Sequence, residues 1–257
     1  MTDTISVDQH IQPRTVEVAQ GWRWISAGFR LYGRSALIWI TFFMIYLVLE
    51  LVLAFFVPVV GAIASALLDP ILIAGFMAGC RAIELDEELE IAHLFAGFSG
   101  RARQLAAVGG YYLSGKLFIV MLAMGVTALV FGPLPELDLA KLEAADAAQL
   151  PDLKPFLFMG SVVMVLLVPL LMAYWFAPAL VLFDGLAAWP AMRLSFAACL
   201  RNIWPFTLYG VAGMVLFVLG SIPLGLGLLA VIPVLFATSV YAAYRDIFVS
   251  ESAENQA

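Results

Sequence analysis

Residues 36–81 read ALIWITFFMIYLVLELVLAFFVPVVGAIASALLDPILIAGFMAGCR, and this stretch decides the fold. It contains two apolar runs, 36–57 and 60–80, each close to the roughly 20 residues that a helix needs to cross a bilayer. Only the segment from Pro58 to Val60 separates the two runs, which leaves room for a tight turn. The stretch therefore predicts a membrane hairpin of two helices.

Four more apolar runs follow, and they predict spans at 105–131, 156–183, 205–221 and 226–244. Apolar residues make up 63% of the 257 residues and charged residues 12%, whereas soluble domains have about 25% charged residues. The connections between the spans are too short to hold a soluble core unaided. We therefore expect an all-α polytopic membrane protein with six transmembrane helices arranged as three hairpins.

The first and last thirds of the chain share a set of landmarks. They are Phe29, Arg34, Pro58, Pro70 and Arg81, and then in the same order Phe196, Arg201, Pro223, Pro233 and Arg245. This order predicts one membrane domain over 17–248, built from internal repeats at about 17–84, 89–184 and 188–248. We expect each hairpin to be preceded by an amphipathic interfacial helix.

Positive charges are distributed unevenly about the spans. Ten arginines lie before the first span, in the second and fourth connections or after the last span, whereas the opposite side carries only Lys141 and Lys154. The positive-inside rule places the arginine side in the cytoplasm. We therefore expect a disordered N-terminal tail (1–16) and a C-terminal tail (249–257) in the cytoplasm, and the acidic connection 132–154 outside.

Two of the predicted interfacial helices combine an apolar stripe with arginines on another face. The stripes are Trp22, Ile25, Phe29 and Tyr32 in the first copy, and Met192, Phe196, Cys199 and Ile203 in the last. The arginines are candidate interfacial lipid contacts, since this pattern suits a membrane surface with anionic head groups: Arg23, Arg30, Arg34, Arg193 and Arg201. Helices that merely cap the spans would show the same pattern.

Three charged residues fall inside the predicted spans: Glu50, Asp69 and Lys116. At 1.5 Å per residue they lie about 21, 17 and 17 Å from the cytoplasmic ends of their helices. A lone charge at such depth is costly, and pairing reduces the cost. We expect Lys116 to pair with Asp69 or Glu50. Asp69 is favoured because Pro70 should disrupt its helix. The alternative is that Lys116 extends to the cytoplasmic surface.

Two glycines in the second span, Gly75 and Gly79, have the spacing that permits close helix packing. Two other motifs give weaker signals. GYYLSGK (110–116) resembles a phosphate-binding loop, but Leu117 stands where the magnesium-binding hydroxyl would be. Glu90 and His93 have the spacing of a bundle metal site without the second copy that such a site needs.

Four segments resemble those of a known family: EIAHLFAGF (90–98), AYWFAPALV (173–181), LSFAACLRN (194–202) and YAAYRDIF (241–248). With the six spans, they resemble a family of uncharacterised bacterial six-span inner-membrane proteins. That family is distantly similar to YciC-like proteins and to the membrane domain fused to some glycerophosphodiester phosphodiesterases. The resemblance implies the bacterial inner membrane. It brings no ligands or catalytic residues, and the phosphodiesterase activity does not transfer without its catalytic barrel.

The sequence predicts a non-catalytic membrane protein that works through its surfaces. The expected partners are membrane lipids, with other envelope proteins or a second copy of the chain as further candidates. The alternative is a small transporter or channel that uses Glu50, Asp69 and Lys116. No catalytic motif appears, and nothing indicates a cofactor, a metal or a nucleotide. The net charge of −6 with no basic block gives no footprint for nucleic acid.

Overall fold

The computed structural model describes residues 12–56, 58–133 and 153–249, and all regular structure in these ranges is helical. Six helical segments are long and apolar enough to cross a membrane: Ala36–Phe55, Pro58–Glu84, Ala102–Phe131, Lys154–Phe183, Ile203–Ser221 and Leu228–Phe248. The chain is therefore an all-α polytopic membrane protein, as its composition predicts. Each span begins and ends within four residues of its predicted bounds.

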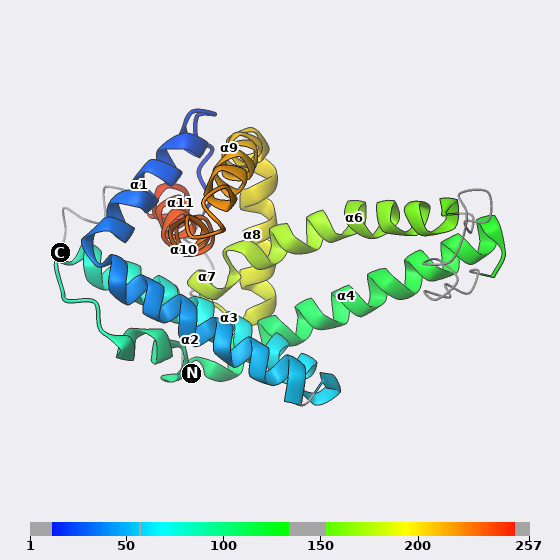
Figure 1. Ribbon diagram of the computed structural model, residues 1–257, viewed down its shortest axis with the longest axis horizontal. Helices are drawn as coiled ribbons and strands as arrows, with labels where there is room; N and C mark the ends of the chain where they lie inside the picture. Colours follow the sequence, from blue (N-terminus) through cyan, green and yellow to red (C-terminus); the bar gives the residue numbers. More distant parts are fainter. Residues whose placement is uncertain (1–11, 57, 134–152, 250–257) are drawn as a thin grey trace, which may run out of the picture. The chain divides into compact units, whose positions relative to one another are not determined.

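The described chain divides by its contacts into two compact units, and the single membrane domain over 17–248 stays a prediction. Unit 1 contains the chain up to Tyr111 and from Met172 onward, and unit 2 contains Tyr112–Leu171. Unit 2 contains most of the two helices of the middle hairpin, α4 (Ala102–Phe131) and α6 (Lys154–Trp175). In unit 2 these two helices run alongside each other (Figure 1), with Gly115 against Leu170 and the rings of Phe131 and Phe158 5.4 Å apart.

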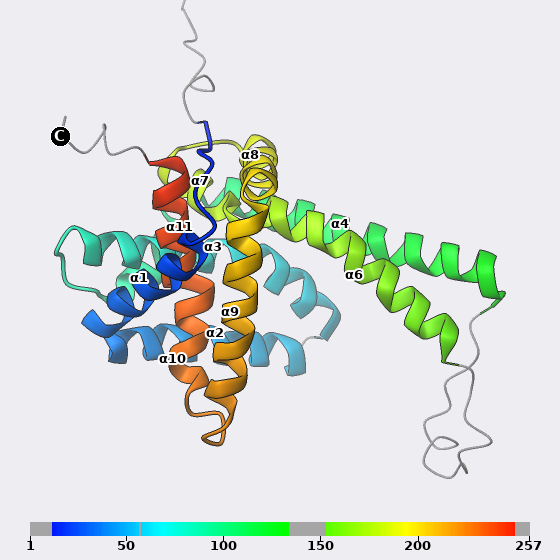
Figure 2. The ribbon, with the colours of Figure 1, turned by 90° about the horizontal axis from the view of Figure 1, so that it is seen from above.

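The helix order repeats along the chain. The first copy has α1 (Gln20–Arg34) followed by α2 (Ala36–Phe56) and α3 (Pro58–Glu84). The last copy has α8 (Ala188–Arg201) and α9 (Ile203–Ser221), then a return span made of α10 (Leu228–Pro233), the π-helix η4 (Val234–Thr238) and α11 (Ser239–Phe248). Within unit 1, α2 lies beside α3, and α9 lies beside α10 (Figure 2). The middle copy begins with a 3₁₀-helix, η2 (Ile91–Phe98), in place of an α-helix.

Pro70 does not break its helix, which corrects our expectation. Helix α3 is continuous from Pro58 to Glu84. Proline cannot bond the carbonyl four residues earlier, and that carbonyl, of Ala66, lies against the backbone of Gly109 in α4. A Cβ atom on Gly109 would lie 2.0 Å from the Ala66 oxygen. The close approach of a glycine therefore covers the carbonyl that Pro70 leaves without its helical partner.

Pro233 interrupts the last span instead. The π-helix η4 follows it directly, and tyrosines from two other helices bond the backbone carbonyls there. The Tyr32 hydroxyl donates to the Leu229 carbonyl at 3.4 Å, and the Tyr209 hydroxyl donates to that of Leu235. Membrane helices tolerate such breaks where neighbouring side chains satisfy the freed groups.

A second break separates α6 from α7 (Ala177–Phe183), next to Pro178. The Ser195 hydroxyl of α8 bridges this break. It accepts a bond from the Phe176 amide at 2.9 Å and donates one to the Met172 carbonyl at 2.7 Å. Ser195 is fully buried, so its two hydrogen bonds satisfy polar groups that would otherwise be unpaired.

Gly75 and Gly79 both lie at close contacts of α3. A Cβ atom on Gly75 would lie 1.9 Å from the Leu94 carbonyl oxygen of η2, and one on Gly97 would lie 2.2 Å from the Ile71 oxygen. Gly79 faces side chains, with Leu89 Cδ1 nearest at 2.8 Å from its ideal Cβ position. The two glycines therefore let η2 and nearby side chains pack directly on α3.

The described start of the chain is held in place, although we expected residues 1–16 to form a disordered tail. The Arg14 amide donates to the Ile247 carbonyl at 2.9 Å. Buried Asn202 accepts a bond from the Val16 amide and donates one to the Arg14 carbonyl, both at 2.9 Å. Residues 1–11 and 250–257 lie outside the described ranges, as does most of the acidic connection 132–154.

Candidate functional site

Helix α1 is wedged against α9 and α11, and this contact determines which of its faces is buried. The buried residues are Gly21, Trp24, Ile25, Gly28 and Tyr32. The stripe predicted from the sequence is therefore partly wrong, since Trp22 is 53% and Phe29 is 37% exposed. The two glycines explain the difference. A Cβ atom on Gly21 would lie 2.2 Å from the Pro205 oxygen, and one on Gly28 would lie 2.4 Å from Ser239 Oγ.

Helix α8 also has a mixed surface. Met192 and Cys199 are buried as the stripe predicts, whereas Ile203 is 49% exposed and belongs to α9. Burial raises the pKa of the Cys199 thiol to about 12, so this thiol stays protonated. The outward face of α8 carries Trp189, which is 57% exposed, and Leu200, which is 53% exposed.

All five candidate lipid-contacting arginines are exposed. Two of them bind the protein itself. Arg34 donates to the Ile83 carbonyl at 2.7 Å and pairs with Asp86, and Arg201 donates to the Pro13 carbonyl at 3.2 Å. Among the described residues, Arg23 bonds only to the side chain of Gln20, one turn away on the same helix. Exposed tryptophans and arginines thus occur together on α1 and α8.

A polar network joins the ends of α3, α7 and α11 in unit 1. The Tyr244 hydroxyl donates to Asp184 Oδ2 at 2.7 Å, and the Arg81 guanidinium lies 5.1 Å from the centre of the Phe183 ring. Burial raises the pKa of the Asp184 carboxyl, while the Tyr244 hydrogen bond and the charge of Arg81 oppose that rise. Beside this group, Glu84 binds both the Tyr241 hydroxyl and Arg245.

Two polar pairs connect α2 and α3 within their apolar spans. The Tyr46 hydroxyl donates to Asp69 Oδ1 at 2.8 Å, and the Ser65 hydroxyl donates to Glu50 Oε2. The sequence analysis missed both donors. A signal was available, because Tyr46 lies four residues before Glu50 and Ser65 lies four residues before Asp69. On antiparallel helices this spacing places each carboxyl opposite a hydroxyl.

Lys116 belongs to unit 2, whereas Glu50 and Asp69 belong to unit 1. The Lys116 ammonium lies 4.8 Å from the centre of the Tyr112 ring, one turn earlier on α4, and the residue is half-buried. A cation over an aromatic face is a favourable contact. The pairing of Lys116 with Asp69 or Glu50 stays a prediction.

The structure gives a local role to each of the two weaker motifs. Residues 110–116 lie inside the continuous helix α4 rather than in a loop between a strand and a helix. His93 Nδ1 lies 3.0 Å from the Glu90 amide nitrogen and accepts its hydrogen bond. The Glu90 and His93 spacing is therefore that of a cap at the start of η2.

Comparison with known proteins gives one informative relative. The chain is 28% identical, over an alignment of 267 positions, to a protein of Burkholderia thailandensis named "Probable inner membrane protein". The alignment covers 91% of this chain and 92% of that protein. No family model matches the chain, and no solved structure matches it. The similarity to an inner-membrane protein agrees with the six membrane-capable helices.

Proposed function

We propose that this chain is a non-catalytic protein of the bacterial inner membrane that interacts with anionic lipids through its arginine-bearing face. In this proposal both chain ends and the arginine face are cytoplasmic. Other envelope proteins, or a second copy of the chain, are further partners that such a face suits. The likeness to YciC-like proteins belongs to the same proposal.

The observation that carries the proposal is the surface chemistry of α1 and α8. Both helices expose a tryptophan next to arginines: Trp22 with Arg23, and Trp189 with Arg193. Tryptophan prefers the head-group level of a bilayer. Each arginine near an anionic membrane surface contributes about 1 kcal/mol of attraction. A helix that only capped the spans would have no need to expose such residues together.

Lipid enrichment tests this proposal. The full chain is reconstituted with equal amounts of phosphatidylglycerol and phosphatidylcholine, re-extracted in mild detergent, and its co-purified lipids are quantified by mass spectrometry. We expect phosphatidylglycerol to be enriched several-fold. The double variant Arg23→Gln/Arg193→Gln should lose most of this enrichment, and the matched Arg23→Lys/Arg193→Lys variant should keep it because the charge remains. Equal recovery of both lipids by the wild-type chain would refute the proposal.

One observation favours a second candidate function. The pairs Tyr46–Asp69 and Ser65–Glu50 place two carboxyl groups inside apolar spans. Ionisable groups at such depth often mark ion or proton pathways. A small transporter or channel is therefore the runner-up. It is distinguished by ion flux in proteoliposomes that depends on Glu50 or Asp69.

A further inference from the structure

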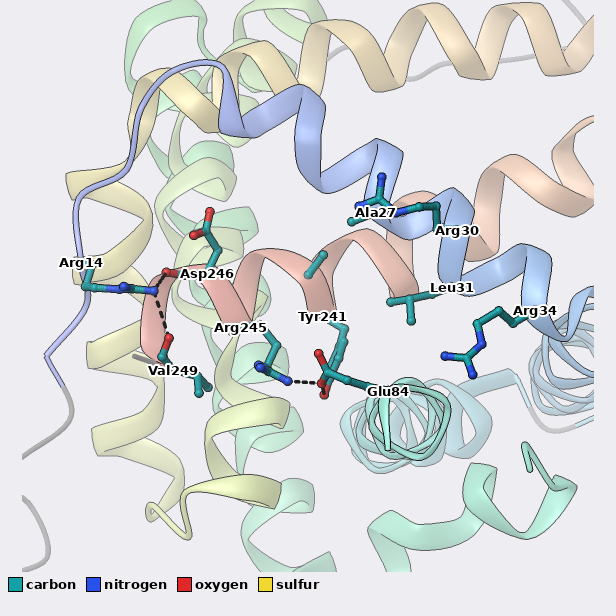
Figure 3. A pocket seen from close by; sticks show the side chains of 11 residues that line it. Arg14, Ala27, Arg30, Leu31, Arg34, Glu84, Tyr241, Arg245, Asp246 and Val249 are labelled. Carbon is teal, nitrogen blue, oxygen red and sulfur yellow. Dashed lines mark hydrogen bonds and ion pairs between the residues drawn. The ribbon is translucent and has the colours of Figure 1, made fainter. Parts of the chain in front are cut away.

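A cavity of about 490 Å³ lies between α1, the end of α3 and α11 in unit 1 (Figure 3). Its size falls within the roughly 300–1,000 Å³ of small-molecule pockets. Six charged residues line it: Arg14, Arg30, Arg34, Arg245, Glu84 and Asp246. Figure 3 shows the arginines approaching from the N-terminal segment, from α1 and from α11, so positive charge surrounds the cavity on several sides.

Both carboxylates of the cavity already have donors. Glu84 accepts bonds from the Tyr241 hydroxyl and from Arg245. Asp246 Oδ2 accepts a bond from the Trp24 indole nitrogen at 2.9 Å. Four arginines against the two lining carboxylates, and against Asp86, which pairs with Arg34, leave a net charge of +1 at the cavity. The positive charge of the cavity therefore favours the binding of an anion.

Two of the arginines are fixed by backbone carbonyls. Arg14 donates to the carbonyls of Asp246 at 2.6 Å and Val249 at 2.9 Å, and Arg34 donates to the carbonyl of Ile83 at 2.7 Å. Arg34 also pairs with Asp86. A guanidinium has five donors, so both arginines keep N–H groups beyond those used. Positioning groups before a ligand arrives lowers the cost of binding.

Arg30 differs from these fixed arginines. It lies one turn before Arg34 on the same side of α1, it is exposed, and among the described residues no carboxylate or carbonyl is bonded to it. The cavity wall near it also includes apolar Ala27 and Leu31. An exposed guanidinium beside fixed ones, next to a small apolar surface, suits a phosphate carried on a short carbon skeleton.

We propose that this cavity binds a negatively charged phosphate ester, and that Arg30 is the protein side chain that completes the binding site. Arginine forms bidentate bonds with phosphate oxygens, which makes it the preferred residue for such groups. An anionic glycerolipid head group and a water-soluble glycerol phosphate share this chemistry. The identification of the ligand as a lipid head group rests on the proposed function above, whereas the binding of a phosphate ester in the cavity does not.

The experiment uses the full chain and two probes. Glycerol 3-phosphate is titrated calorimetrically into the detergent-solubilised protein, with neutral glycerol as the blank. Phosphatidylglycerol is titrated in nanodiscs and followed by native mass spectrometry. We expect saturable binding of one molecule per chain for at least one probe. Arg30→Gln should weaken it at least tenfold, and Arg34→Gln should weaken it as well.

Arg103→Gln is the matched control, because Arg103 is an exposed arginine on α4 that neither lines the cavity nor belongs to the candidate lipid contacts. Its saturable binding should stay unchanged. Binding of phosphatidylglycerol alone would identify a lipid head group, and binding of both probes would identify the phosphate ester as sufficient. The proposal is overturned if neither probe saturates, if Arg30→Gln binds like the wild-type chain, or if Arg103→Gln weakens binding as much as Arg30→Gln does. If the wild-type chain showed no phosphatidylglycerol enrichment but still bound a probe in the cavity, only the proposed function would be refuted.

Discussion

Substituting alanine for Gly75 is expected to destabilise the folded chain by about 3 kcal/mol or more, at the upper end of the cost of overpacking. The added methyl would lie 1.9 Å from the carbonyl oxygen of Leu94. That oxygen belongs to the backbone of η2, so no rotamer change can relieve the clash. The 3₁₀-helix must move away from α3, which would expose the buried face of Leu94.

The chain offers both a matched control and a native reporter for this change. Apart from its chain neighbours and the nearby backbone of α9, no described atom lies within 4 Å of the ideal Cβ position of Gly210. Gly210→Ala should therefore be neutral or stabilise by up to about 1 kcal/mol. Cys80 and Cys199 are both buried free cysteines. A thiol-reactive dye therefore reports unfolding during a thermal ramp. If Gly75→Ala had the same melting temperature as Gly210→Ala, η2 would not pack as closely on α3 as the structure shows.

Replacing Glu50 with leucine is expected to stabilise the chain by about 1–3 kcal/mol. A charge inside a span costs at least roughly 2.5–3.5 kcal/mol on insertion scales, and an interhelical hydrogen bond in a membrane returns only about 0.6–1.7 kcal/mol. Ser65 donates to Glu50 Oε2, but Glu50 Oε1 is buried and accepts no hydrogen bond from the described residues. The measurement is reversible unfolding in detergent micelles or bicelles.

Ser65→Ala provides the opposite sign. It removes the donor and leaves the carboxyl in place, so we expect a loss of about 1 kcal/mol. The double variant Ser65→Ala/Glu50→Leu should then match Glu50→Leu, because no carboxyl remains to be satisfied. A Glu50→Leu chain less stable than the wild type would show that the carboxyl stabilises the hairpin, contrary to this account.

The spans could be predicted from sequence because apolar length alone determines them. The burial of α1 could not, because it depends on the partners of the helix. The apolar residues of α1 are spread so that more than one of its faces could be buried. The contacts of Gly21 with Pro205 and of Gly28 with Ser239 determine that the face of Trp24 and Ile25 is the buried one. The composition of an interfacial helix can be read from a single sequence, but which of its faces turns toward the rest of the protein cannot.

The effect of each proline was equally hidden in the sequence. Pro70 and Pro233 occupy corresponding places in the repeat, yet only the second is followed by a π-helix. The carbonyl freed by Pro70 lies against Gly109. Near Pro233, by contrast, the hydroxyls of Tyr32 and Tyr209 donate hydrogen bonds to backbone carbonyls of the span. These contacts come from distant parts of the chain, so local pattern could not distinguish the two prolines.

The arginine-bearing helices could be located from the sequence, whereas the lipid contact of their arginines stays a prediction. The arginines of α1 and α8 follow from their spacing, and they are exposed as an interfacial role requires. The cavity was missed because Arg14 was assigned to a tail, and Glu84 and Asp246 have no motif. Only the fold brings the ends of α3 and α11 beside α1.

The proposed function requires the arginine face to lie on the cytoplasmic side of the membrane. Cysteine accessibility tests this directly, since Cys80 and Cys199 are buried and give a low background. Ser99 follows η2 near Arg101, and Ser221 ends α9 at the opposite end of its span; both are exposed. A membrane-impermeant maleimide should label Ser221→Cys in intact cells and Ser99→Cys only after lysis. Labelling of Ser99→Cys in intact cells, with Ser221→Cys protected until lysis, would contradict the account.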